Sequence, residues 1–411
     1  MTERILIVGA GQAGMQIAVS LRDAEYEGSI TIVGEEAHGP YQRPPLSKAF
    51  LAGESDEESL ELRSPAFYVE NDIVVITGER VVDVRWDPTH GTAVTNTGRE
   101  IAFDKLALTT GADVRRLDVE GSDLDGVLYL RGIDDARALK SRWDAATNVV
   151  VIGGGFIGLE VAAVARKNGK TTTVIHRSER LMSRVVSPTT SKFFKEAHER
   201  RGTSVLLDTQ IARFLGDGDK VSGVELGDGT VIPADIVMIG IGVVPRGDLA
   251  QKLGLDLSGD SIVVDRFAST SDTRIVAAGD AVVMPHPLTG QGQVALESVQ
   301  NAVDQAKVAA NTLMGIEKEY FAVPWFWSDQ DTMKLQMAGI SAGYDETVLR
   351  GNPDDEKFSV IYYRDGRLIA IDSVNEVLDY MAVRKALGAG QTIPADKAGD
   401  TSVKLKDMVE D

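Results

Sequence analysis

Several residue types and segments that are missing from the sequence exclude whole classes of structure and function. None of its 411 residues is cysteine, which excludes disulfides, thiolate metal sites and a redox-active cysteine pair. Its five histidines are scattered, so no metal site is expected. No apolar run approaches the ~18 residues of a membrane span. Acidic residues outnumber basic ones by 62 to 43, whereas nucleic-acid-binding proteins normally show the opposite balance. We therefore expect a cytoplasmic protein whose partners are neither nucleic acid nor membrane.

What is present is ordinary for a soluble globular chain, at 43% hydrophobic and 26% charged residues. The length predicts two or three domains, because single cores stop growing near ~250–300 residues. The start, MTERILIVGAGQAG, places a positive residue before an apolar run, as signal peptides do. Its glycines and Gln12 nevertheless stand where a phosphate-binding loop needs them, so we interpret it as part of the fold.

The stretch ILIVGAGQAG predicts the strand, turn and helix start of a dinucleotide-binding βαβ unit. In this motif Gly9 makes the turn, Gly11 lets the backbone approach a pyrophosphate, and Gly14 lets helix and strand pack closely. The positive end of the helix then holds the phosphate charge. Glu35 follows a second apolar strand 21 positions after Gly14, near the ~20-residue offset of a ribose-binding carboxylate. The alternative is an ordinary βα turn with a surface acid.

The loop HGPYQRPPLSKAFLAG, residues 38–53, carries two adjacent prolines between two cations, Arg43 and Lys48. Because proline fixes φ, we expect a stiff, extended segment at Pro44 and Pro45. The cations are either solvated charges on a rigid surface loop or neighbours of a phosphate or flavin.

A second fingerprint, NVVVIGGGFIG, places Gly153, Gly155 and Gly158 after another apolar strand, about 144 positions from the first. We expect its helix to run over 159–167. Two such units form an internal repeat and predict two bound dinucleotides, since one fingerprint binds one. Their reactive rings must meet for chemistry to follow.

The carboxylate expected at the end of the second repeat's next strand is missing, because His176 and Arg177 stand there instead. A carboxylate prefers a 2′-hydroxyl, whereas a cation accommodates a 2′-phosphate. Arg177, with Arg180 or Arg184, is therefore a candidate 2′-phosphate clamp. The alternative is an exposed basic turn.

The rest of the chain predicts an α/β protein with further short strands. Residues 73–110 suggest an antiparallel meander returning to a strand at 105–108, and another helix is expected over 295–313. From about residue 321 the pattern predicts a small α+β domain with a helix over 376–387 and a loosely packed tail, 388–411. The expected domain segments are 1–111, 112–243, 244–320 and 321–411.

In order, the motifs GAGQAG, YQRPPLSKAFLAG, TTGA, VVVIGGGFIGLE, IGIGVVP, AAGDA, ESVQNA and PWFWSDQ resemble the FAD-dependent reductases of [2Fe–2S] ferredoxins. This family includes putidaredoxin reductase, palustrisredoxin reductase and the reductase components of aromatic-ring dioxygenases. The resemblance implies a glutathione-reductase-like fold: an FAD domain in two segments, an inserted NAD(P) domain and a C-terminal α+β domain.

The resemblance also implies where the cofactors bind. FAD contacts would come from the first fingerprint and its surroundings: Gly9, Gly11, Ala13, Gly14, Glu35, Arg43, Lys48, Val81, Thr110, Gly111, Arg131, Gly279, Asp280, Val299 and Trp327. NADH or NADPH contacts would come from the second: Gly153, Gly155, Phe156, Ile157, Gly158, Glu160, His176, Arg177, Arg184 and Gly242. Lys48 and Glu160 are the expected catalytic residues, with Glu160 beside the nicotinamide and paired with Lys48 across the flavin.

By this resemblance the chain would pass a hydride from NAD(P)H to FAD and then single electrons to an acidic [2Fe–2S] ferredoxin serving a cytochrome P450 or Rieske-type oxygenase. The ferredoxin would need a local basic patch on a chain of net charge −19, with Lys307 and Lys334 as candidates. A monomer or weak homodimer is expected.

His176 stands where members of the family that prefer NADH usually carry Glu or Asp, so NADPH use is a real alternative. Two other activities also stay open: an apoptosis-inducing-factor-like NAD(P)H-binding flavoprotein, and a diaphorase or quinone reductase. Thiol-dependent reductases are excluded, because they need cysteine.

Overall fold

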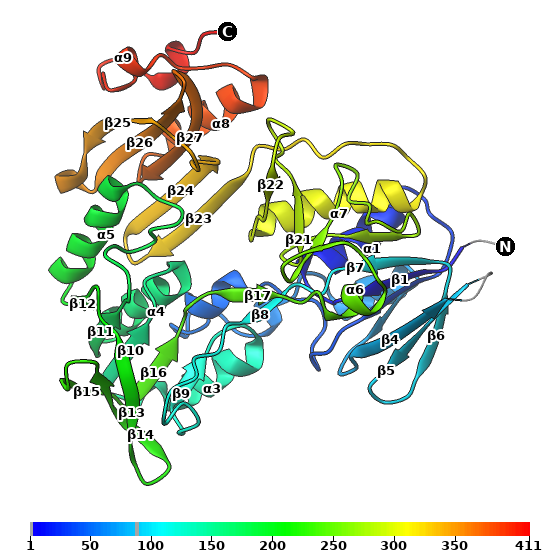
Figure 1. Ribbon diagram of the computed structural model, residues 1–411, viewed down its shortest axis with the longest axis horizontal. Coiled ribbons are helices and arrows are strands. Elements are labelled where there is room, and N and C mark those ends of the chain that lie inside the picture. The colour runs from blue at the N-terminus through cyan, green and yellow to red at the C-terminus, as the bar shows by residue number, and fades with distance from the viewer. Residues whose placement is uncertain (1–2, 87–89) are drawn as a thin grey trace. The chain divides into compact units, whose positions relative to one another are not determined.

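The computed structural model describes residues 3–86 and 90–411 (Figure 1). It divides into two compact units. Unit 1 comprises Met1–Gln42, Glu57–Asp113 and Val244–Pro324, and unit 2 comprises Arg43–Asp56, Val114–Val243 and Trp325–Asp411. The chain crosses between the units after Gln42, Asp56, Asp113, Val243 and Pro324, and two of these crossings fall inside β8 (Ala112–Val114) and β17 (Val243–Pro245). Residues 43–56, which the sequence grouped with the first segment, pack with unit 2.

Unit 1 is built on a five-stranded parallel sheet in the order β20-β7-β1-β2-β3. Its strands are β1 (Ile5–Val8), β2 (Ile30–Val33), β3 (Ile73–Ile76), β7 (Lys105–Leu108) and β20 (Ile275–Ala277). The chain runs outward from β1 through β2 to β3 on one side, and β7 and β20 lie on the other. The change of direction between β1 and β7 is the topological switch point at which such sheets bind ligands.

Helices and smaller sheets complete unit 1. Helix α1 (Gln12–Asp23) packs against α7 (Val299–Leu313), and both bury small and aliphatic side chains. The three-stranded antiparallel sheet contains β4 (Val81–Trp86), β5 (Gly91–Thr95) and β6 (Glu100–Phe103). A four-stranded sheet contains β18 (Leu257–Ser258), β19 (Ser261–Val263), β21 (Val282–Pro285) and β22 (Gln293–Val294). The short helices are η2 (Glu58–Leu60), α2 (Pro65–Glu70) and α6 (Asp248–Lys252).

Unit 2 repeats the parallel arrangement in the order β12-β11-β10-β16-β9. These strands are β9 (Val127–Tyr129), β10 (Asn148–Ile152), β11 (Thr171–Ile175), β12 (Ser204–Leu206) and β16 (Ile236–Ile239). The helices of this part are α3 (Ile133–Trp143), α4 (Phe156–Lys167) and α5 (Pro188–Arg200). A three-stranded antiparallel sheet adds β13 (Ile211–Asp217), β14 (Lys220–Leu226) and β15 (Val231–Pro233).

The repeat extends to individual hydrogen bonds. The Gly9 N–H donates to the carbonyl of Val33 at 2.8 Å, and the Gly153 N–H donates to that of Ile175 at 2.9 Å. In both cases the first fingerprint glycine is tied to the end of the neighbouring strand. The predicted α/β class and the internal repeat are therefore confirmed.

The C-terminal part of unit 2 is an antiparallel sheet in the order β23-β24-β27-β26-β25, with α8 (Val377–Ala389) packed on β24 and β27 (Figure 1). Its strands are β23 (Trp325–Gln330), β24 (Met333–Gly339), β25 (Glu346–Asn352), β26 (Lys357–Arg364) and β27 (Arg367–Val374). The remaining short helices are η3 (Pro353–Asp355), α9 (Ala395–Ala398) and η4 (Leu405–Asp407).

The loosely packed tail expected after residue 388 is wrong. Ile393, Ala398 and Leu405 are buried, and the Arg350 guanidinium donates to the carbonyls of Ala398 and Val403 at 3.2 and 2.8 Å. The buried tail residues are too widely spaced to form a helix or strand period, so the sequence pattern did not indicate a packed segment.

Three local expectations also differ. Pro44 and Pro45 are not extended but open the 3-10 helix η1 (Pro44–Ser47), because a proline's fixed φ suits the first turn of a helix. β3 leaves the expected meander and joins the parallel sheet beside β2. Helix α7 begins at Val299, four residues later than expected, where the Ser298 hydroxyl accepts the Asn301 N–H at 3.0 Å.

None of the helices in the described part of the chain combines the length and apolarity needed to cross a bilayer.

Candidate functional site

The first glycine turn lies at the switch point of unit 1. Gly9 has φ of +116°, and a Cβ there would lie 2.1 Å from the carbonyl oxygen of Thr109 at the end of β7. A Cβ at Gly14 would lie 2.0 Å from the carbonyl oxygen of Gly9. Both positions therefore exclude any larger residue for reasons internal to the fold.

Gly11 is different, because a Cβ there would meet no chain atom within 4 Å. Its φ of −89° is open to any residue, so neither packing nor backbone geometry demands glycine. Gly11 is also the N-cap of α1, has no side chain to cap the helix, and is followed by no acid in the first turn. An open space in front of uncapped N–H groups fits the pyrophosphate of a dinucleotide.

The other residues of unit 1 that are expected to bind FAD lie on several elements. Gly279 follows β20, with φ of +87°, and a Cβ there would lie 3.3 Å from that of Ala13. The Gly279 N–H donates to Oε1 of Gln305 at 2.9 Å. Val299 is the first residue of α7. Asp280 is half-buried after Gly279, and Val81 is buried at the start of β4.

Glu35 is exposed after β2, and its carboxylate pairs with two arginines. The distance to Arg246 is 2.6 Å, and the distance to Arg80 is 4.0 Å. The Arg246 backbone also accepts from the Thr110 hydroxyl at 2.7 Å and donates to the Gly111 carbonyl at 2.9 Å. Arg246 thus connects three residues expected to bind FAD, although it was not itself predicted. Its only signal was a cation directly after IGIGVVP.

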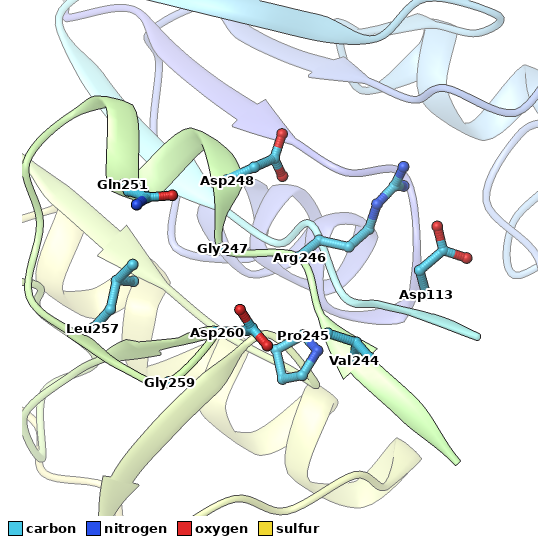
Figure 2. A pocket seen from close by; sticks show the side chains of 10 residues that line it. All are labelled: Asp113, Val244, Pro245, Arg246, Gly247, Asp248, Gln251, Leu257, Gly259 and Asp260. Carbon is cyan, nitrogen blue, oxygen red and sulfur yellow. The ribbon is translucent and has the colours of Figure 1, made fainter. Parts of the chain in front are cut away.

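A pocket of about 310 Å³ lies beside Arg246 in unit 1 (Figure 2). Asp113, Asp248 and Asp260 supply carboxylates to its lining, and Gly247 and Gly259 expose backbone. The pocket borders the Glu35–Arg246 pair, which is suited to bind hydroxyl groups through both of its charges.

The second glycine turn, in unit 2, has the same division of roles. A Cβ at Gly153, where φ is +115°, would lie 2.2 Å from the Gly240 carbonyl oxygen, and one at Gly158 would lie 2.5 Å from that of Gly153. Gly155, the N-cap of α4, again faces open space. A second dinucleotide phosphate therefore fits in front of α4.

Three further residues were expected to contact the nicotinamide nucleotide at this turn. The Phe156 ring packs on that of Phe326 with centroids 4.6 Å apart, and Ile157 is 43% exposed. Gly242 is exposed, with φ of +103°.

The basic turn after β11 separates into buried and exposed parts. His176 accepts the Gly154 N–H on Nδ1 at 3.1 Å, and burial lowers the pKa of its imidazole. A neutral ring that accepts on Nδ1 carries its hydrogen on Nε2, so His176 supplies no charge near neutral pH. Arg180 donates to the carbonyls of Val186 and Ser183 and so closes the loop.

Arg177 and Arg184 are the exposed cations of this turn. Neither has a hydrogen bond or ion pair within residues 3–86 and 90–411. Of the three arginines that the sequence offered as a 2′-phosphate clamp, these two keep an available guanidinium.

Glu160, on α4, is 3% exposed, and its carboxylate is fully engaged. Oε2 accepts from Lys48 Nζ at 2.7 Å and from the Ser47 hydroxyl at 2.6 Å. Oε1 accepts from the Ser328 hydroxyl at 2.6 Å. The expected pairing of Glu160 with Lys48 is therefore present, but it is a direct ion pair and not one across the flavin, and the Lys48 side chain, which is 20% exposed, is its accessible member. The sequence did not indicate Ser47 or Ser328, because serine is common in loops and strands.

The other residues expected near the flavin from unit 2 lie in two places. The Arg43 guanidinium donates to the Arg131 carbonyl at 2.9 Å. The half-buried Trp327, on β23, lies with its ring 5.6 Å from that of Trp325.

Comparison with known proteins agrees with this architecture. Residues 3–306 match the family described as pyridine nucleotide-disulphide oxidoreductase, and residues 325–409 match the reductase C-terminal family. Rhodocoxin reductase of Rhodococcus erythropolis is 44% identical over 402 residues, which cover 98% of this chain and 93% of that protein.

Two solved structures superpose over nearly the whole chain. The ferredoxin reductase for the CYP199A2 system of Rhodopseudomonas palustris has a TM-score of 0.94 and 41% identity, covering 98% of this chain and 99% of that one. The putidaredoxin reductase of its covalent complex with putidaredoxin has a TM-score of 0.95 and 36% identity, with coverages of 99% and 98%. These matches confirm the predicted family and fold. The chain therefore belongs to the pyridine nucleotide-disulphide oxidoreductase family, and it is an oxidoreductase that contains FAD and uses NAD(P)H.

Proposed function

We propose that this protein is a ferredoxin reductase that passes electrons from NAD(P)H through FAD to a [2Fe–2S] ferredoxin serving an oxygenase. The observation that carries the proposal is the pair of open glycine turns, at Gly11 and Gly155, in a chain without cysteine. Two dinucleotides are accommodated while no thiol is available, so the acceptor must take electrons from the flavin itself. Bound FAD supplies this step, because it accepts a hydride and releases electrons singly.

We assign the FAD site to the switch point of unit 1. Gly9, Gly11, Ala13 and Gly14 would surround the pyrophosphate, and Glu35 would bind the adenosine ribose while Arg246 orients its carboxylate. Thr110, Gly111, Gly279 and Asp280 would follow the phosphate and ribityl chain, with Val81 and Val299 near the rings. From unit 2 we assign Arg43, Lys48, Arg131 and Trp327 to the flavin.

We assign the nicotinamide dinucleotide to the turn from Gly153 to Gly158 with Phe156, Ile157 and Gly242. Lys48 and Glu160 are proposed to act at the reacting rings. Because Glu160 is buried and Lys48 partly exposed, Lys48 would present the charge and Glu160 would hold it in position.

The open cations Arg177 and Arg184 favour NADPH alongside NADH. Arg177→Glu removes one cation and introduces a carboxylate, so we expect the ratio of kcat/KM for NADPH to that for NADH to fall at least about tenfold, a typical loss for one charge-assisted phosphate contact. Lys404→Glu makes the same charge change at an exposed tail position and should leave the ratio unchanged. An unchanged ratio in Arg177→Glu would show that this arginine faces solvent only.

We propose that the partner is an acidic [2Fe–2S] carrier and not a nucleic acid. We also propose that the reductase itself is cytoplasmic and is a monomer or a weak dimer. Of the two candidate docking lysines, Lys307 pairs with Asp304 at 3.1 Å and is partly neutralised. Lys334 is exposed on β24 and is the stronger candidate.

The test is reduction of cytochrome c that depends on added carrier. With NADH or NADPH present, a [2Fe–2S] ferredoxin should stimulate reduction, while ferricyanide reduction proceeds without it. Rubredoxin, a one-iron carrier, serves as the comparison acceptor. Ferricyanide reduction with no response to any [2Fe–2S] ferredoxin would contradict the proposal and favour the diaphorase or the apoptosis-inducing-factor-like alternative.

A further inference from the structure

A buried chain of polar side chains runs from Glu160 into the C-terminal part of unit 2. Ser328 donates to Oε1 of Glu160 at 2.6 Å, Gln330 Nε2 lies 3.2 Å from the Ser328 oxygen, and Oε1 of Gln330 lies 2.8 Å from His198 Nε2. All four side chains are at most 3% exposed. Buried polar groups are costly unless every one of them is satisfied, so an uninterrupted chain of this kind needs an explanation.

The chain links three elements of unit 2. Glu160 is on α4, His198 is on α5, and Ser328 and Gln330 are on β23. Residues two apart on a strand share a face, so Ser328 and Gln330 point the same way and Trp327 points the opposite way. One face of β23 thus carries the buried polar chain, and the other carries the residue assigned to the flavin.

The direction of every hydrogen bond follows from the charge on Glu160. An ionised carboxylate only accepts, so the single hydroxyl hydrogen of Ser328 must point to it. The Ser328 oxygen must then accept from the Gln330 amide, which turns the Gln330 carbonyl oxygen toward His198. His198 must therefore donate through Nε2, and all the donors point toward Glu160.

We propose that His198, Gln330 and Ser328 form a positioning network that holds the Glu160 carboxylate, and through it the Lys48 ammonium, in place for nicotinamide–flavin chemistry. This inference rests on the role proposed above for Lys48 and Glu160. None of the three network residues needs to touch either cofactor. They act through the carboxylate, which is fixed on one oxygen by Ser328 and on the other by Ser47 and Lys48.

The kinetic test is a double-mutant cycle on flavin reduction measured by stopped flow in the holoenzyme. Ser328→Ala removes the donor to Oε1, and we expect the rate at saturating NAD(P)H to fall about tenfold, a typical loss for a hydrogen bond to a buried charge, with little change in the nicotinamide Kd. In the Lys48→Met background the same substitution should cause no further loss, because its effect passes through Lys48. Equal losses in both backgrounds, or no loss in either, would overturn the inference.

Ser359→Ala is the matched control. Ser359 is also fully buried on a strand of unit 2 and also donates to a carboxylate, that of Asp379 at 3.1 Å, but it does not belong to the network. It should leave the rate of flavin reduction within about twofold. A loss as large as that of Ser328→Ala would show a general effect of weakening the C-terminal part and would overturn the inference.

A spectroscopic test does not depend on activity. The ¹⁵N shifts of the imidazole should report the Nε2–H form of His198 in the wild-type protein. In Glu160→Gln the new amide oxygen should face Lys48 and Ser47, and its NH₂ should face Ser328. The direction of the chain then reverses, and His198 should change to the Nδ1–H form. A wild-type Nδ1–H form, or the same form in both proteins, would contradict the network.

These outcomes separate the two proposals. Failure of carrier-dependent cytochrome c reduction in the wild-type protein would overturn the proposed function but leave the His198 result standing. Normal carrier reduction together with an unaltered Ser328→Ala rate would overturn the network alone. If Lys48→Met leaves flavin reduction unchanged, the role of the Lys48–Glu160 pair and the network that serves it both fail.

Discussion

Alanine at Gly11 should weaken FAD binding without harming the fold, whereas alanine at Gly14 should harm both. The structure separates the two glycines by what an added methyl group would meet. At Gly14 it would lie 2.0 Å from the Gly9 carbonyl oxygen, so the turn itself must move. At Gly11 it would meet no chain atom within 4 Å, and φ of −89° suits alanine.

The size of the effect follows from this difference. Replacing glycine by alanine at a compatible backbone position changes stability by only about 0.4–1 kcal/mol, in the stabilising direction. The methyl group at Gly11 would instead occupy the space assigned to the pyrophosphate, at the cost of at least one hydrogen bond to a charged group, about 1.5–3 kcal/mol. Gly11→Ala should therefore bind FAD about 10- to 100-fold more weakly at nearly unchanged stability.

The assay combines two measurements on the same preparations. FAD affinity is measured by titrating the apoprotein and following the quenching of flavin fluorescence, and stability is measured by urea unfolding of the apoprotein. Gly227→Ala is the control, since its methyl group would meet only ordinary contacts at 3.7 and 3.9 Å, and it should alter neither quantity appreciably. Wild-type FAD affinity in a folded Gly11→Ala protein would refute the assignment of the pyrophosphate to this turn.

Three further predictions use the same reasoning elsewhere. Gly155→Ala should keep FAD but raise the KM for the nicotinamide nucleotide about tenfold or more, measured with ferricyanide as acceptor. An unchanged KM would contradict the assignment of the nicotinamide dinucleotide to the second glycine turn. Arg246→Ala should weaken FAD binding about tenfold, because Glu35 loses its 2.6 Å partner. Arg80 lies 4.0 Å from Glu35, so Arg80→Ala should have a smaller effect. A larger effect of Arg80→Ala would count against the role of Arg246. Burial raises the pKa of Asp372 from 3.8 to about 6, so the folded state holds this proton more tightly than the unfolded state, and the carboxyl group costs about 3 kcal/mol of stability as pH rises through this window. The urea midpoint of the wild-type protein relative to Asp372→Asn should therefore fall between pH 4 and 6, and a constant or rising difference would contradict the shift.

Much of the fold could be predicted from the sequence because its signals are local. A buried strand, a tight turn and a helix start occupy about ten consecutive residues, and two of the three motif glycines, Gly9 and Gly14, are required by atoms of the adjoining strand or of the turn itself. The strand at Lys105–Leu108 was also predicted with its observed bounds, since an apolar run followed by small residues leaves little choice. Pairing partners were harder, and β3 was placed in the wrong sheet because its short apolar run fits either type of sheet.

The residues surrounding Glu160 show what only the tertiary structure decided. Ser47 lies 113 positions from Glu160, and Ser328 lies 168 positions from it. No sequence pattern distinguishes either serine from a solvent-exposed serine. Their roles arise only when η1, α4 and β23 fold together. Arg246 is a similar case, since its place beside Glu35 depends on where the chain re-enters unit 1.

The sequence by itself therefore determined the two glycine turns, the family and the absence of thiol chemistry, because each depends on residue types or on spacings within a single turn of chain. The tertiary structure decided which charged side chains form hydrogen bonds or ion pairs within the protein and which remain available to a ligand. It buries Glu160 behind Lys48, uses Arg180 to close a loop, and leaves Arg177 open. Burial and pairing are properties of atoms brought together from distant parts of the chain, so no local pattern can carry them.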